Sequence, residues 1–254
     1  MMKGAEPIFI DKKSKLGILM LHGFSSTPDE FRELSSYFAD KGFTVSVPLL
    51  AGHGTSPEEM LKTNANDWAN SAKEAYLKLK QKSNKVFLIG NSFGSDIIFW
   101  LAKEFNNEQE GIVSLGAPIF LRYHAILVLR LYTYGLVQRF YTKPPRLYKT
   151  DYTDMLDEVT YSKIPTKSVR QFLRFIKKEA VPILKKVKIP TLVIHSDNDG
   201  VISPKSATYI YQHLGSDFKR LHWFNSSCHI ATKDANKSEL FEKIFAFLEE
   251  VTKS

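Results

Sequence analysis

Residues 85–103 read KVFLIGNSFGSDIIFWLAK, and this stretch decides the fold. Its opening apolar run, Val86–Ile89, has no polar alternation, which predicts a strand buried on both faces. Ser92 follows between Gly90 and Gly94, and helical spacing begins directly afterwards. Strand, sharp turn and helix form the context in which a G-x-S-x-G sequence exposes a nucleophile. Without that context the same letters would describe only a glycine-flanked surface turn.

Short apolar runs of this kind recur along the chain. They cover Leu16–His22, Phe43–Pro48, Lys85–Gly90, Gly111–Gly116, Thr191–His195 and Arg220–Phe224. Helical patterns separate them, at residues 28–41, 67–82, 93–104, 204–214 and 238–251. Thr27 can cap the first of these helices and Gly42 can end it. Strand and helix alternate before residue 117 and after residue 189, which predicts a doubly wound, mostly parallel α/β sheet.

Residues 118–188 interrupt this alternation with a helical excursion. The segment holds 15 Lys or Arg and 5 Asp or Glu, a net charge of +10, whereas the rest of the 254-residue chain carries −2. We therefore expect residues 1–117 and 189–254 to form the core and residues 118–188 to form a basic helical cap. Such charge suggests nucleic acid, an anionic lipid surface or simply a solvated face. No nucleic-acid motif accompanies it, so nucleic acid is not an expected partner.

Composition narrows the remaining classes. A single cysteine, Cys228, excludes an intrachain disulfide framework and any multi-cysteine metal site. The first residues carry charge with no apolar run behind it, so we expect no signal peptide. No stretch of about 18 uncharged apolar residues occurs, so no membrane span is expected. The simplest compartment is the cytoplasm, and the sequence carries no signal for a metal, a cofactor or an oligomeric state.

A serine nucleophile needs a base, and an acid to orient that base. His229 is the preferred base because it lies in a polar loop after the last strand, whereas His222 falls within a strand pattern and His213 at a helix end. His195 ends a strand but comes just before the acid candidates. Asp199 and Asp197 both follow that strand. We favour Asp199 as the acid; Asp197 is the alternative acid, and we interpret it as a turn-forming residue.

Backbone N–H groups must stabilise the oxyanion in such chemistry. His22-Gly23-Phe24 ends an apolar run and Phe93 begins the helix after Ser92, so we assign the oxyanion hole to the amides of Phe24 and Phe93. Phe24 can also be a core aromatic, and the two roles are compatible.

These motifs resemble the α/β-hydrolase superfamily, and within it the small bacterial monoacylglycerol lipases and carboxylesterases. The matching strings are residues 22–28, 48–55, 67–68, 90–94, 199–204 and 227–232. The resemblance implies a serine esterase whose helical cap, inserted after the sixth strand, covers an acyl pocket. By position it assigns the catalytic triad to Ser92, Asp199 and His229. In monoglyceride lipases of this type an acidic residue tends to follow the cap tyrosine, but here Tyr161 is followed by Ser162 and Lys163.

The expected reaction is hydrolysis of short- to medium-chain acyl esters, with monoacylglycerols as one candidate, through an acyl-enzyme. We expect Phe120, Ile126, Leu127, Tyr161 and Val201 to contact the small-molecule ester, and the basic cap to associate weakly with anionic lipid. A thioesterase, acyltransferase, peptidase or lactonase would keep the same triad. A hydrolase-like binding protein without activity is the other alternative.

Overall fold

The computed structural model describes residues 1–133, 138–143, 159–226 and 229–253, and its centre is a seven-stranded sheet. The strands are β1 (Ile8–Ile10), β2 (Leu16–Leu21), β3 (Thr44–Val47), β4 (Lys85–Asn91), β5 (Gly111–Leu115), β8 (Thr191–Ser196) and β9 (Lys219–Phe224). Their order is β1-β3-β2-β4-β5-β8-β9, and only the β1–β3 pair is antiparallel. All six predicted strands are present. The short edge strand β1 was not predicted, because three residues give too little periodicity.

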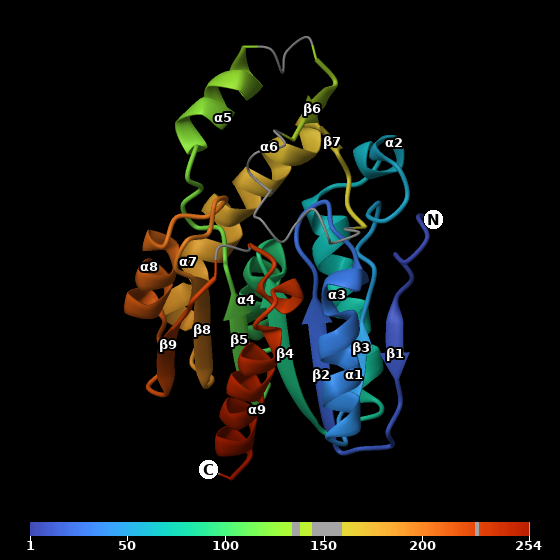
Figure 1. Cartoon of the computed structure of the whole chain (residues 1–254), viewed down its shortest axis with the longest axis vertical. Coiled ribbons are helices and arrows are strands. Elements are labelled where there is room, and N and C mark those ends of the chain that lie inside the picture. The colour runs from blue at the N-terminus through green and yellow to red at the C-terminus, as the bar shows by residue number, and fades with distance from the viewer. Residues whose placement is uncertain (134–137, 144–158, 227–228, 254) are drawn as a thin grey trace.

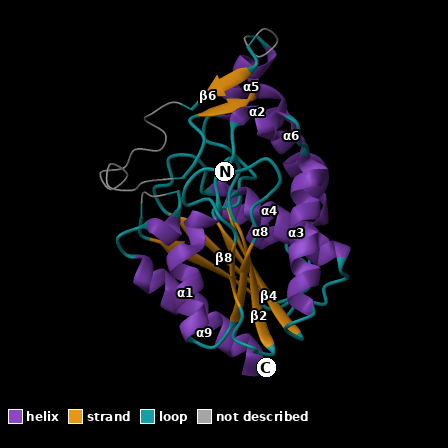
Figure 2. Ribbon diagram, turned by 90° about the vertical axis from the view of Figure 1, so that its right-hand side faces the viewer, coloured by secondary structure: helices purple, strands orange, loops and turns teal. Residues whose placement is uncertain are grey.

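Helices cover both faces of this sheet, as Figure 2 shows. They are α1 (Arg32–Asp40), α3 (Ala65–Lys80), α4 (Phe93–Glu104), α8 (Lys205–His213) and α9 (Lys237–Lys253). The short helix α2 (Pro57–Leu61) lies beyond the sheet and packs mainly against residues 163–175. Leu19 and Leu21 of β2 pack in the cluster that includes α3 and α4, whereas Ile18 and Met20 pack in the cluster under α1 and α9. Alternate residues of one strand therefore enter two separate cores, which is why the strand sequences are continuously apolar.

Two helix starts differ from their predictions. A 3₁₀ turn (Pro28–Phe31) precedes α1, and Thr27 does not cap it; the Thr27 hydroxyl instead donates to the carbonyl of Val159 at 2.9 Å. Helix α3 begins two residues before Asp67, because Asn64 and Asp67 form a reciprocal capping box. Gly42, with φ of +89°, follows the end of α1 as predicted.

The segment 118–188 leaves the sheet after β5, the fifth strand in chain order rather than a sixth. Its described elements are α5 (His124–Tyr132), β6 (Phe140–Thr142), β7 (Lys163–Pro165), α6 (Thr166–Phe175) and α7 (Val181–Ile183), with a π turn (Ile176–Ala180) before α7 and a 3₁₀ turn (Leu184–Lys186) after it. α5 and the antiparallel β6–β7 ribbon lie beyond the carboxyl ends of the parallel strands (Figure 1). The ribbon was not predicted. From α6 onward the segment returns along α3 and α4.

Across the described ranges, no helix has both the length and the apolar character that crossing a bilayer requires.

Candidate active site

Ser92 occupies the turn between β4 and α4 in a backbone conformation that side chains rarely adopt, with φ of 51° and ψ of −122°. Holding a residue in such a conformation costs about 1–3 kcal/mol of folding free energy, so the surrounding structure must keep Ser92 there. One restraint is the hydrogen bond from the Ser92 amide to the carbonyl of Leu115, at 2.7 Å. The turn places Ser92 at the N-terminus of α4, where backbone N–H groups are unpaired.

The two glycines of the motif are required sterically, as predicted. A Cβ on Gly94 would lie 1.9 Å from the carbonyl oxygen of Leu21 on β2. A Cβ on Gly90 would lie 2.5 Å from backbone atoms of Gly94 and Ser95 at the start of α4. Because glycine has no Cβ, the helix and the strands can approach closely enough to form the sharp turn.

Asp199, which is buried, and His229, which is partly exposed, form a hydrogen-bonded pair. The Nδ1 atom of His229 lies 2.7 Å from Oδ2 of Asp199, while Oδ1 accepts from the amides of Val201 at 2.7 Å and Ile202 at 2.9 Å. Burial by itself would raise the pKa of Asp199, but the charge of His229 and these hydrogen bonds outweigh burial and hold the pKa below its usual value. With an ionised Asp199 the network assigns the imidazole proton to Nδ1 and the lone pair to Nε2, the tautomer of a general base.

The alternative acid, Asp197, is exposed, and its amide donates to the carbonyl of Phe224 at 3.0 Å. The structure therefore brings Asp199, and not Asp197, to His229.

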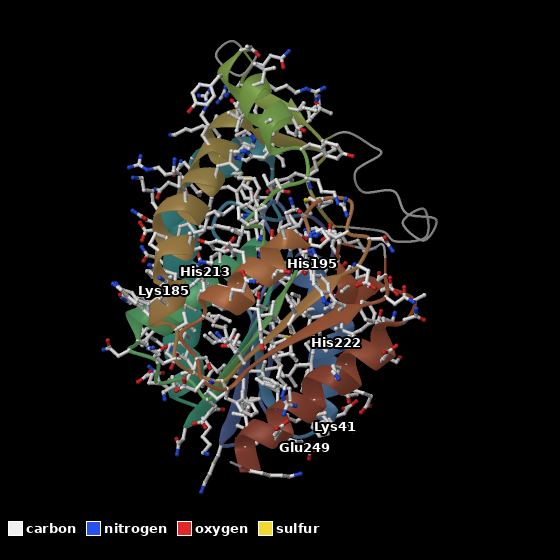
Figure 3. The ribbon with its side chains drawn as sticks, turned by 90° about the vertical axis from the view of Figure 1, so that its left-hand side faces the viewer. Lys41, Lys185, His195, His213, His222 and Glu249 are labelled. Carbon is white, nitrogen blue, oxygen red and sulfur yellow. The ribbon has the colours of Figure 1, made fainter. Side chains whose placement is uncertain are left out.

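The alternative histidines lie on separate elements (Figure 3). His213 ends α8, where Nδ1 contacts the carbonyl of Tyr209 at 2.8 Å. His222 is half-buried in β9, and burial lowers its pKa. Of these three histidines, His195 lies nearest to Asp199, with Nε2 3.9 Å from Oδ2, but its side chain is fully buried in β8. Burial also lowers the pKa of His195, and Asp199 opposes that effect.

Ser92 and His229 both line a cavity of about 330 Å³. Most of the remaining wall is apolar and comes from segments far apart in the sequence. Its apolar residues include Phe24, Leu121, Ile126, Leu127, Ile164, Val169, Phe172, Val201 and Ile230. Ile126, Leu127 and Val201 are thus in the wall, where the sequence predicted substrate contacts. The sequence did not identify Val169 and Phe172, although their spacing of three residues on α6 is a helical signal for one shared face.

Phe120 and Tyr161, which the sequence also predicted to contact substrate, are not among the residues that line this cavity. Phe120 packs edge-to-face on Tyr209 with ring centroids 5.3 Å apart, and its amide donates to the Ser206 hydroxyl at 2.8 Å. Tyr161 is buried, and its hydroxyl donates to the carbonyl of Gly52 and accepts from the amide of Thr55, at 2.9 and 2.7 Å. Both side chains attach the segment 118–188 to the body of the protein.

Phe24 and Phe93 belong to one aromatic cluster. The ring of Phe24 stacks on Phe172 with centroids 4.7 Å apart and contacts Phe93 edge-to-face at 6.0 Å. Within the described residues, neither backbone N–H of these two phenylalanines donates to a protein acceptor. Phe24 therefore combines a packed aromatic side chain with an amide available to a ligand.

No three His, Cys, Asp or Glu side chains gather as a metal site would require in the ranges that the structure describes.

The sheet topology, with a serine turn after a central strand and an Asp–His pair beyond later strands, is that of the α/β-hydrolases. Residues 12–236 match the family model described as "Serine aminopeptidase, S33", and the chain belongs to this family.

Individual relatives extend over nearly the whole chain. The chain is 31% identical over 250 residues to the thermostable monoacylglycerol lipase of Bacillus sp. (strain H-257), covering 97% of this chain and 95% of the relative. It is 25% identical over 245 residues to a carboxylesterase of Bacillus subtilis (strain 168), covering 96% of each. The resemblance predicted from the motifs is confirmed.

Solved structures agree. One from work on LipS and LipT, two metagenome-derived lipolytic enzymes, superposes with a TM-score of 0.90 at 30% identity and covers 98% of this chain and 99% of that one. A soluble variant of the monoglyceride lipase of Saccharomyces cerevisiae in complex with a substrate analogue superposes with a TM-score of 0.78, covering 94% of this chain and 87% of that one. At 17% identity it shows the fold alone.

Proposed function

We propose that this protein hydrolyses short- to medium-chain acyl esters through an acyl-enzyme on Ser92, with Asp199 and His229 completing the triad. Its relatives, a monoacylglycerol lipase and a carboxylesterase, make the chain a carboxylic ester hydrolase. The observation that carries the triad assignment is the 2.7 Å Asp199–His229 contact together with Ser92 and His229 in the wall of one apolar cavity.

The mechanism follows from this arrangement. Nε2 of His229 removes the proton as the Ser92 hydroxyl oxygen attacks the ester carbonyl, and Asp199 stabilises the imidazolium that forms. The amides of Phe24 and Phe93 donate to the oxyanion, a role in which one donor is worth about 3 kcal/mol in other hydrolases. His229 then protonates the leaving alcohol, so the ester C–O bond breaks and the acyl group remains on Ser92. A water molecule, deprotonated by His229, attacks the acyl-enzyme and releases the acid.

The size and lining of the cavity support the proposed range of acyl-chain lengths. Its volume of about 330 Å³ lies at the low end for small-molecule sites, and its wall offers aliphatic and aromatic surface to an acyl chain. Ile126, Leu127, Val169 and Phe172 of this wall come from residues 118–188, which supports the assignment of that segment as a cap. Monoacylglycerols are included among the proposed substrates.

Kinetics with Ser92→Ala test the proposal. The wild type hydrolyses p-nitrophenyl butyrate and Ser92→Ala loses at least a thousandfold of that rate; a variant that keeps the wild-type rate contradicts the assignment. A panel of p-nitrophenyl esters of graded length, monoacylglycerols, acyl-CoA and alanine p-nitroanilide then separates ester hydrolysis from thioesterase and peptidase activity. A preference for acyl-CoA or for the anilide contradicts the proposed substrate class.

We also propose that the basic cap associates weakly with anionic lipid. On α5 the side chains of Ile126, Leu129 and Tyr132 are 52%, 64% and 69% exposed, and Arg122 and Arg130 lie beside them in the sequence. Apolar side chains among cations suit an interface that carries anionic headgroups. Vesicles with 30% phosphatidylserine should bind the protein in low salt, and neutral vesicles should not. Equal binding to both kinds of vesicle, or to neither, contradicts the proposed lipid association.

A cytoplasmic location, which the single cysteine favours, is also part of the proposed function.

A further inference from the structure

Glu30 is a buried carboxylate that the mechanism above does not use. It lies in the 3₁₀ turn before α1, is 5% exposed, and lines the same cavity as Ser92 and His229. Its Oε2 atom accepts two hydrogen bonds, from the amide of Gly23 at 3.0 Å and from the side-chain Nδ2 of Asn91 at 3.0 Å. Burial shields both hydrogen bonds from water, so loss of this oxygen would leave two donors without their acceptor.

The two donors occupy matching places in the site. Gly23 directly precedes Phe24, and Asn91 directly precedes Ser92. One carboxylate oxygen therefore joins the loop that carries a proposed oxyanion amide to the turn that carries the proposed nucleophile. The approach is close, since Oε1 of Glu30 and Cβ of Ser92 both lie 3.3 Å from the point where a Cβ on Gly23 would stand.

The same turn also contacts the segment that follows the base. The backbone carbonyl of Glu30 accepts from the hydroxyl of Thr232 at 2.6 Å, and Asp29 forms an ion pair with Lys233. Thr232 lies three residues after His229. Residues 28–31 thus contact the segments that carry Phe24, Ser92 and His229, three of the four that supply the proposed catalytic groups.

We propose that Glu30 is a positioning residue that holds the amide of Phe24 in register with Ser92. This inference rests on the proposed function. The strained backbone of Ser92 and the Phe24 amide, which has no acceptor within the described residues, both need restraint from neighbouring residues. The Glu30 bridge supplies it by holding Asn91, the residue before Ser92, and Gly23, the residue before Phe24. A misplacement of about 1 Å in such a site can reduce turnover about a hundredfold, whereas substrate affinity depends mainly on the apolar wall.

Three variants separate this role from a purely structural one. Glu30→Ala removes the bridge. Glu30→Gln keeps one oxygen that can accept from both Gly23 and Asn91, so it keeps the geometry without the charge. Glu33→Gln is the matched control, because Glu33 is an exposed acid three residues later whose partner is Lys237 at 2.8 Å.

Steady-state kinetics with p-nitrophenyl butyrate should show kcat at least thirtyfold lower in Glu30→Ala, with KM within about threefold of the wild type. Glu30→Gln should recover kcat to within about fivefold of the wild type, and Glu33→Gln should be unchanged. Labelling of Ser92 by a fluorophosphonate should slow in parallel with kcat. Hydrogen exchange at the amides of residues 22–26 should be faster in Glu30→Ala alone.

A folded Glu30→Ala with wild-type kcat and wild-type labelling overturns the inference, as does a Glu30→Gln no better than Glu30→Ala. Where Glu30→Ala does not fold, Asn91→Leu removes one donor of the bridge at similar volume. It should lower kcat about tenfold with KM unchanged, and an unchanged kcat overturns the inference. A failure of the proposed function appears in the wild type, as absent turnover and absent labelling, whereas a failure of this inference appears only in the variants.

Discussion

Replacing Asp199 by Asn should disable the enzyme while leaving its fold intact. The Asp199 carboxylate accepts three hydrogen bonds, two from the amides of Val201 and Ile202 and one from Nδ1 of His229. An asparagine has a single acceptor oxygen. Keeping both backbone bonds turns its NH₂ group toward His229, which forces the imidazole proton onto Nε2. The histidine then cannot accept a proton from Ser92.

The size of the effect follows from this tautomer. The equivalent change in a serine protease lowers kcat about 10⁴-fold, or about 5.5 kcal/mol in the activation barrier. We expect a loss of 10³ to 10⁴ in kcat for p-nitrophenyl butyrate at pH 8, with KM little changed. Thermal unfolding should show that the variant is folded.

Asp197→Asn is the matched control, because Asp197 is exposed and lies only two residues away. Its kcat should stay within twofold of the wild type. An Asp199→Asn protein that keeps more than a tenth of the wild-type kcat, or an Asp197→Asn protein that loses as much, would refute the reasoning.

Three further predictions concern stability and specificity. Glycine tolerates the positive φ at position 92, so Ser92→Gly should be more stable to urea than Ser92→Ala by about 1 kcal/mol; equal stabilities would contradict strain at the turn. Burial lowers the pKa of His22 to about 3 and that of His53 to about 4, so both stay neutral when folded but gain protons on unfolding below pH 6.5. Stability to urea should be full above pH 6.5 and fall by up to about 1.4 kcal/mol per pH unit for each histidine between pH 6.5 and 4. His53→Phe should flatten that slope, and an unchanged slope would contradict the assignment. Leu127→Trp fills part of the cavity wall and should shift the preference among p-nitrophenyl esters toward shorter chains, whereas an unchanged chain-length profile would place Leu127 outside the acyl site.

The features that the sequence predicted are those governed by local pattern. Strands buried on both faces appear as continuous apolar runs, so β4 and its neighbours were found within about one residue. Ser92 was identified because Gly90 and Gly94 mark a turn where a Cβ would collide with backbone. Asp199 and His229 follow their strands in chain order, and the topology brings them to one edge of the sheet.

The features that the sequence did not predict depend on contacts between distant segments. In the sequence, Phe120 and Tyr161 look as suitable for an acyl pocket as Ile126 and Leu127 do. In the structure they contact Tyr209 and Gly52 of the core and are not among the residues that line the cavity. Composition gives no direction to a side chain in such a segment. Glu30 looks like an ordinary acid in the first turn of a helix, and only the meeting of three loops shows that its partners are Gly23 and Asn91.

Labelling with a fluorophosphonate followed by peptide mapping tests the central claim most directly. The account predicts a single adduct per chain on Ser92, with ester turnover lost in proportion to labelling. A single adduct on another residue, or a protein that hydrolyses esters while Ser92 stays unmodified, would contradict it.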